Sequence, residues 1–257
     1  YNYSGQVTKV KDALGNVTTF AYGGAGCPSC GSSIDKLTSL TDANGNTTIF
    51  QYDTQGGLIK ETDPIGNAVN YSYDANGNLT SRTDASGNTI NYVYDPLDRL
   101  IQKTYPDGTT EAFQYDKNGN LTYAGNKNIA YNFSHDTRDR VIGVVDSNGR
   151  TLIYQYDPMG NRTQMVTPQG RMVTYAYDGA NRLSQIVSNA GKFNFSYDSL
   201  GRRTKLSMPN RTFTAYGYDP ATRLTDLTHK TSLGLTIDRF AYTHDKVGNR
   251  LTRTDLD

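Results

Sequence analysis

The sequence lacks an excess of charge of one sign, and it lacks long hydrophobic runs. Lys and Arg number 26 against 25 Asp and Glu, so the net charge of +1 provides no basic field for nucleic acid or anionic lipid. No stretch approaches the length of a membrane span, so we expect no membrane insertion. The opening residues, YNYSGQVTKV, lack the charged and apolar regions of a signal peptide.

Tryptophan is absent, and aliphatic bulk is scarce. Hydrophobic residues make up 35% of the chain, and the mean hydropathy is -0.65. Such a composition is too poor for a thick core. What the chain does have is 20 Tyr and 25 Gly, which suit a β-sheet that is half exposed to water.

One phrase recurs along the whole chain. The pair Tyr-Asp occurs eight times, mostly at steps of 21 residues, and His135-Asp136 fills the one long gap as a degenerate copy. The repeat-signature residues are Tyr52, Asp53, Tyr73, Asp74, Gly77, Tyr94, Asp95, Tyr115, Asp116, Gly119, Tyr156, Asp157, Gly160, Tyr177, Asp178, Tyr197, Asp198, Gly201, Tyr218 and Asp219. A fixed period of this length indicates a repeat architecture.

Each repeat contains a second turn signal about halfway along. Examples are DALGN (12–16), DANGN (42–46), DPIGN (63–67), DASGN (84–88) and DSNGR (146–150). Asp at the first position accepts backbone hydrogen bonds, and Gly at the fourth adopts a positive φ, which together predict a type I turn with a bulge. Two turns per repeat leave two segments of about six residues, the usual strand length. One repeat is therefore predicted to be one β-hairpin.

The strand before each Tyr-Asp pair alternates between aromatic and polar residues. Residues two apart share a face of a strand, so pairs such as Tyr71 and Tyr73 lie on one face while Asn70 and Ser72 lie on the other. The returning strand is expected to add an aliphatic residue to the ring side at Leu79, Leu100, Leu121, Val141, Leu183, Leu224 and Leu251. One face is thus predicted to be aromatic and the other polar.

These patterns predict an all-β fold in which tandem β-hairpins form one long curved antiparallel sheet. Long open sheets twist and curl, and curling would cover the aromatic face, which we expect to lie on the concave side. We expect residues 1–257 to form a single array of about twelve hairpin units, with insertions near 23–36 and 227–236. Because the first residue already lies inside a repeat, we also expect the chain to be a fragment of a longer protein.

The tandem pattern D-x-x-G-[NR]-L, D-x-x-G-[NR] and Y-x-Y-D resembles the YD repeat of the Rhs family. That family includes bacterial Rhs and wall-associated toxins, the B and C components of insecticidal toxin complexes, and teneurins. The resemblance implies a spiralling β-sheet that forms part of a hollow shell, and it implies a passenger toxin or effector domain of the parent protein as the partner. It also implies a secreted or cell-surface protein. A dozen hairpins are fewer than a full shell needs, so we expect part of a wall.

We therefore expect a non-enzymatic scaffold, a segment of an Rhs-type β-shell that encloses or presents a passenger domain. No Ser-His-Asp grouping, phosphate loop or unlike pair of carboxylates stands apart from the repeating background, so no catalytic residue is predicted. The alternative is a surface adhesion module that binds glycans through its aromatic ladder. The structural alternative for the same rings is that cross-strand contacts between them stabilise the sheet.

Two further motifs suggest ligands. Cys27 and Cys30 lie in a glycine-rich insertion and are compatible with a small disulfide or inert pair, half of a zinc site, or a redox dithiol. Zinc would need two more ligands, and the three histidines, His135, His229 and His244, are all remote in sequence. The D-x-N-G-N turns resemble the front of a calcium loop, but they lack its glycine placement and its distal Glu, and turn formation alone explains them. No resident cofactor is predicted.

Overall fold

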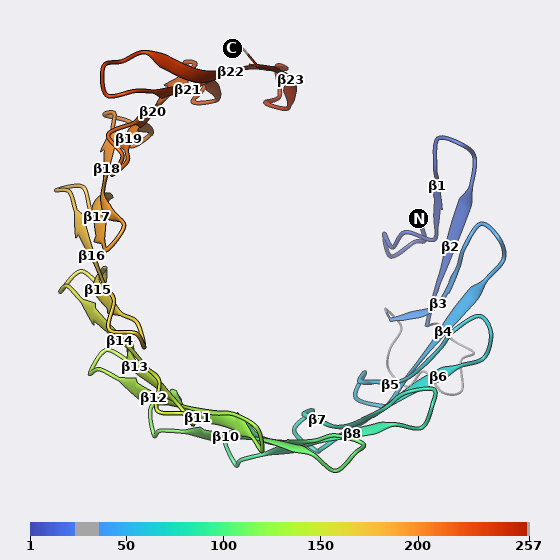
Figure 1. The fold of residues 1–257 in the computed structure, drawn as a ribbon. Helices are drawn as coiled ribbons and strands as arrows, with labels where there is room; N and C mark the ends of the chain where they lie inside the picture. Colours follow the sequence, from blue (N-terminus) through green and yellow to red (C-terminus); the bar gives the residue numbers. More distant parts are fainter. Residues whose placement is uncertain (24–35, 256–257) are drawn as a thin grey trace. The chain divides into compact units, whose positions relative to one another are not determined.

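The computed structural model describes residues 1–23 and 36–255. Within these two ranges the chain forms 23 β-strands and no helix, and the strands belong to one antiparallel sheet (Figure 1). The predicted all-β hairpin fold is confirmed. Among these residues no helix exists that could cross a membrane.

The chain divides into two units, residues 1–131 and 132–257. The strands of the first unit are β1 (Lys9–Lys11), β2 (Val17–Tyr22), β3 (Leu37–Thr41), β4 (Thr47–Tyr52), β5 (Leu58–Thr62), β6 (Ala68–Tyr73), β7 (Leu79–Thr83), β8 (Thr89–Tyr94), β9 (Leu100–Thr104), β10 (Thr110–Tyr115) and β11 (Leu121–Asn126). Each of them pairs with the next in chain order. Taken alone, this unit is a row of hairpins that bends along its length (Figure 1).

Strand β12 (Ala130–His135) contains the point where the first unit ends. The later strands are β13 (Val141–Asp146), β14 (Thr151–Tyr156), β15 (Arg162–Val166), β16 (Met172–Tyr177), β17 (Leu183–Ser188), β18 (Gly191–Tyr197), β19 (Arg203–Ser207), β20 (Phe213–Tyr218), β21 (Leu224–Lys230), β22 (Thr236–His244) and β23 (Arg250–Asp255). From β13 onward each strand again pairs with its successor. The sequence around 227–236 forms a longer hairpin, because β21 and β22 extend to 7 and 9 residues.

The register places the aromatic residues on one face. Tyr71 lies opposite Arg82, whereas Ser72 lies opposite Ser81 on the other face. The pairing shifts at each signature tyrosine, as between Ser72 and Tyr73, and this bulge brings Tyr73 opposite Leu79. Because a bulge adds one residue to one strand, it keeps Tyr73 and Leu79 on the same face as Tyr71. We call this side of the sheet the ring face.

The structure corrects one expected member of the ring face. Arg250, not Leu251, lies opposite His244, and the Leu251 side chain is 64% exposed. Two more repeats also place arginine at this position, where Arg162 lies opposite Tyr156 and Arg203 lies opposite Tyr197. The spacing in the sequence already carries this signal, because Arg162, Arg203 and Arg250 each follow the aspartate of their turn by five residues, as the aliphatic residues of the other repeats do.

The sheet has one layer and very little fully buried volume. Its accessible surface is 16344 Å², whereas a compact protein of this mass exposes roughly 11,000 Å². None of the described side chains is less than 2% exposed. The apolar contacts therefore lie along the ring face, between side chains of neighbouring strands, and not between two packed layers.

Candidate functional site

The signature residues form two kinds of contact at the sheet edge that carries the turns after each Tyr-Asp pair. We call this edge the YD edge; it contains the turns at 53–57, 74–78, 95–99, 116–120, 136–140, 157–161, 178–182, 198–202, 219–223 and 245–249. The opposite edge, which we call the return edge, carries the turns halfway through each repeat, such as 84–88.

Asp74 shows how the signature aspartate closes its turn. Its Oδ1 accepts the backbone N–H groups of Asn76 at 3.0 Å and Asn78 at 2.8 Å, and Asn78 Nδ2 donates to Oδ2 at 3.0 Å. Gly77 has φ 88°, and the same left-handed conformation occurs at Gly119, Gly160 and Gly201. These bonds, led by that from the Asn78 side chain, lower the pKa of Asp74. The geometry is the predicted turn.

The signature tyrosines bind the backbone of the preceding repeat. The hydroxyl of Tyr94 donates to the carbonyl of Leu79 at 3.0 Å. The last backbone pair between β7 and β8 toward this edge is Ser81 with Asn91, so the tyrosine satisfies a carbonyl beyond the end of the ladder. The other signature tyrosines donate to carbonyls 14 or 15 residues earlier at 2.8 to 3.0 Å: Tyr52, Tyr73, Tyr115, Tyr156, Tyr177, Tyr197 and Tyr218.

Arginine at the end of a YD-edge turn adds a second contact between repeats. Arg99 Nε donates to Asp95 Oδ2 at 2.7 Å, while Nη1 donates to the carbonyl of Asp116 in the next YD-edge turn at 3.0 Å. The guanidinium carbon also lies 4.8 Å from the centre of the Tyr115 ring. We call this combination an arginine clamp. It recurs at Arg140, Arg182, Arg202 and Arg223, the last through its Asp219 and Asp245 bonds.

The clamp also lowers the pKa of the aspartate that it contacts. The hydrogen bond from Arg140, together with backbone N–H groups, lowers the pKa of Asp136 from 3.8 to about 2. The sequence interpretation named the aspartates and tyrosines but missed the arginines. The available signal was an Arg four residues after the signature Asp, where other repeats have Asn.

Among the described residues, the ligand motifs considered from the sequence form no metal site. Cys27 and Cys30 lie outside the described residues. Within the ranges the structure describes, no group of three His, Cys, Asp or Glu side chains could hold a metal ion. His229 Nδ1 instead forms a hydrogen bond of 2.9 Å with the Thr214 hydroxyl, and its ring meets Phe240 edge-on. Asp42 and Asp74 use their carboxylates within their own turns.

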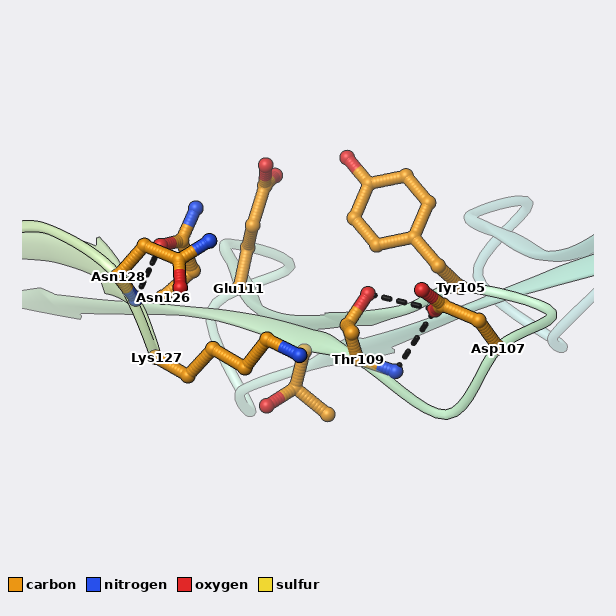
Figure 2. Close-up of a pocket in the computed structure, with 8 residues that line it drawn as sticks. Tyr105, Asp107, Thr109, Glu111, Asn126, Lys127 and Asn128 are labelled. Atoms are coloured by element: carbon orange, nitrogen blue, oxygen red, sulfur yellow. Dashed lines mark hydrogen bonds between the residues drawn. The ribbon is translucent and has the colours of Figure 1, made fainter.

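The hairpins at residues 100–131 depart from the repeat at the return edge. Tyr105 takes the place of the turn aspartate, and the next turn is shortened, so that Asn126 donates to the carbonyl of Ile129. A polar hollow of about 280 Å³ lies between these two turns. Figure 2 shows the Glu111 carboxylate and the Tyr105 ring projecting to the same side of the sheet, with Asn126 beside Glu111.

Comparison with solved structures supports the fold. A crystal structure of TcdB2-TccC3-Cdc42 matches with a TM-score of 0.57 and 16% identity, covering 86% of this chain and 15% of that one. A crystal structure of TcdB2-TccC3 without its hypervariable C-terminal region matches with a TM-score of 0.55 and 16% identity, covering 93% and 14%. The chain thus spans about 15% of the length of the solved chains. A search of curated proteins gives no match.

Family models identify the repeats themselves. The RHS repeat matches residues 1–26 and 33–64, and the teneurin YD-shell matches residues 67–215, which include six of the eight Tyr-Asp pairs and four of the five clamp arginines. Both descriptions refer to structural repeats, in agreement with a sheet whose signature residues serve its own edge. The chain belongs to the teneurin YD-shell family.

Proposed function

We propose that the chain is a non-enzymatic segment of the wall of a YD-repeat shell that encloses or presents a passenger domain of its parent protein. One observation carries the proposal most strongly: the sheet has a single layer, and none of the described side chains is fully buried. A single-layer sheet with an extensive aromatic face has the properties of a wall, because one face can contact solvent while the other contacts an enclosed domain.

The signature contacts fit this role. Each tyrosine and each arginine clamp joins one YD-edge turn or strand end to its neighbour, so the residues repeated most faithfully are used for cohesion along the sheet. Catalysis would require unlike groups converging at one place, whereas these contacts recur from repeat to repeat along the sheet. From the family membership we extend two properties to this chain: it encloses a toxin or effector domain, and its parent is a secreted or cell-surface protein. The matched families give no support to glycan adhesion.

Limited proteolysis of the full-length parent protein tests enclosure. We expect the passenger domain to resist protease in the parent and to be cleaved rapidly when expressed without the repeats. Both samples should be followed by mass spectrometry under native conditions, so that fragments are assigned to the repeats or to the passenger. Equal cleavage rates in the two samples would rule out enclosure.

A further inference from the structure

The residue opposite the penultimate ring of each hairpin determines how completely the ring face is covered. The register identifies this position in ten hairpins as Leu40, Glu61, Arg82, Lys103, Ala124, Met165, Ile186, Leu206, Leu227 and Arg253. Nine of the ten are long side chains, and three are basic. Only Ala124, which lies opposite Phe113, is small.

The small residue leaves a hollow in the ring face. It measures about 210 Å³, and Phe113, Tyr131, Glu111 and Asn126 line it above the backbone of Ala124 and Gly125. Gly125 contributes only backbone to the floor of this hollow. Two aromatic side chains and one carboxylate thus border a space that a side chain fills in neighbouring repeats.

Contacts between basic and aromatic side chains elsewhere in the sheet indicate what fits such a space. The guanidinium of Arg162 lies 5.6 Å from the Tyr154 ring centre and 4.8 Å from that of Tyr175, between two aromatic residues of successive hairpins. On the opposite face of the sheet, Lys205 lies 4.1 Å from the centre of the Phe213 ring. Aromatic faces attract cations through their quadrupole, and this sheet uses that attraction repeatedly.

Charge favours a cation in the hollow as well. Glu111 is bordered by Lys103, whose Nζ is 3.8 Å from the carboxylate but donates at 3.0 Å to the Tyr105 hydroxyl. The Glu111 side chain remains 32% exposed, so its carboxylate has room for a second partner. Residues 1–131 carry 13 acidic and 9 basic side chains, a net charge of -4, whereas residues 132–257 carry 12 and 17, a net charge of +5.

We propose that the hollow above Ala124 and Gly125 binds an arginine or lysine side chain presented by a polypeptide held against the ring face. The basic group lies between the Phe113 and Tyr131 side chains and pairs with the Glu111 carboxylate, in the space that Arg82 and Lys103 occupy in their own hairpins. This proposal deepens the proposed function and rests on it in one respect, that the polypeptide belongs to an enclosed passenger.

Peptide titration of the 257-residue chain tests the ligand. The probe is acetyl-Gly-Gly-Arg-Gly-Gly-amide, and its control replaces arginine with citrulline, which has nearly the same shape but no charge. We expect the arginine peptide to bind about tenfold more tightly, because the citrulline peptide loses both the cation–ring attraction and the ion pair. Equal affinities, or no binding of either peptide at millimolar concentration, would overturn the proposal.

Three variants test whether the peptide binds in the hollow above Ala124 and Gly125. Ala124→Arg supplies the basic side chain from within, as Arg82 does in its hairpin, and should abolish peptide binding with the circular dichroism spectrum unchanged. Glu111→Gln should weaken binding about fivefold to tenfold. Glu61→Gln removes a carboxylate at the position equivalent to Ala124 in another hairpin of the same unit, with the same change in net charge, and should leave binding unchanged.

The controls separate local from general effects. Normal binding by Ala124→Arg, or an equal loss in Glu61→Gln and Glu111→Gln, would show that the peptide does not occupy this hollow. The proteolysis experiment on the parent protein tests whether the passenger is enclosed, and its result does not depend on peptide binding. If the passenger is protected but the arginine peptide does not bind, the binding role of the hollow is overturned and the proposed function remains.

Discussion

At the scale of single residues, the repeat uses each signature side chain for a defined main-chain group. The tyrosine hydroxyl satisfies a carbonyl of the preceding repeat, and the aspartate satisfies the N–H groups of its own turn. Since the ring of Tyr94 is also partly buried, which raises the pKa of its phenol, the tyrosine contributes apolar contact and a hydrogen bond together. This double use accounts for tyrosine, and not phenylalanine, in the Tyr-Asp pair.

Replacing Tyr94 with phenylalanine removes only the hydroxyl. We expect the free energy of unfolding to fall by about 1 kcal/mol, because the Leu79 carbonyl loses its donor. The matched control is Tyr92→Phe on the same strand and face, since Tyr92 forms no hydrogen bond to a carbonyl of the described residues. Urea denaturation of both variants measures the difference, and an equal effect in the two would contradict the assigned role.

Acid should weaken the turns in a defined range. The pKa of Asp136 is lowered from 3.8 to about 2 in the folded chain, so the unfolded chain binds the proton first as pH falls. The stability contributed by this carboxylate is therefore complete above about pH 4 and is lost as pH falls toward 2. Denaturant midpoints between pH 2 and 6 measure this loss, and Arg140→Gln should make the curve shallower. A midpoint independent of pH would refute the prediction.

At the scale of elements, hairpins differ in how strongly they are joined to their neighbours. Arginine clamps occur at one YD-edge turn in residues 1–131 and at four in residues 132–257, counting only the described turns. Four other YD-edge turns end in asparagine and use shorter contacts, such as the bonds from Asn76 and Asn78 to Asp98. In a repeat protein stability is roughly a sum of units and their interfaces, so the clamps should create local differences.

A pair of opposite substitutions tests the clamp. Arg182→Asn keeps a cap for Asp178 but removes the bond to the Asp198 carbonyl and the contact with the Tyr197 ring, so we expect a loss of about 1 kcal/mol. Asn161→Arg introduces an arginine at the equivalent position, where it can form the same clamp with the next YD-edge turn, and it should stabilise its hairpin by a similar amount. Hydrogen exchange in β15 to β19 measures both effects, and changes of the same sign would show that the clamp is not responsible.

At the scale of the whole molecule, the absence of a second layer should be visible in solution. A compact protein of this length has a radius of gyration of about 18 Å. Because the chain exposes 16344 Å² of surface, well above the value for a compact protein of equal mass, we expect a clearly larger radius. X-ray scattering at several concentrations measures it for the monomer. A monomer radius near 18 Å would contradict a single-layer sheet.

Much of this protein was predictable because its patterns act over short distances. The Asp-x-x-Gly turns act within five residues, and period-two alternation assigns Tyr71 and Tyr73 to one face without knowledge of any partner. The number of strands, the hairpin topology and the family resemblance all follow from these signals. The prediction that the rings face the concave side stays a prediction, and so does the single array of about twelve units.

What only the tertiary structure decided depends on register between strands. The bulge between Val93 and Tyr94, for example, accompanies the hydrogen bond from the Tyr94 hydroxyl to a carbonyl 15 residues away. The arginine clamps and the hollow above Ala124 depend on the same alignment, because each joins residues of different strands or turns. Composition and periodicity determine which residues share a face, but a contact between them also requires the offset of one strand against the next, and that offset is set by bulges and turn lengths along the whole sheet.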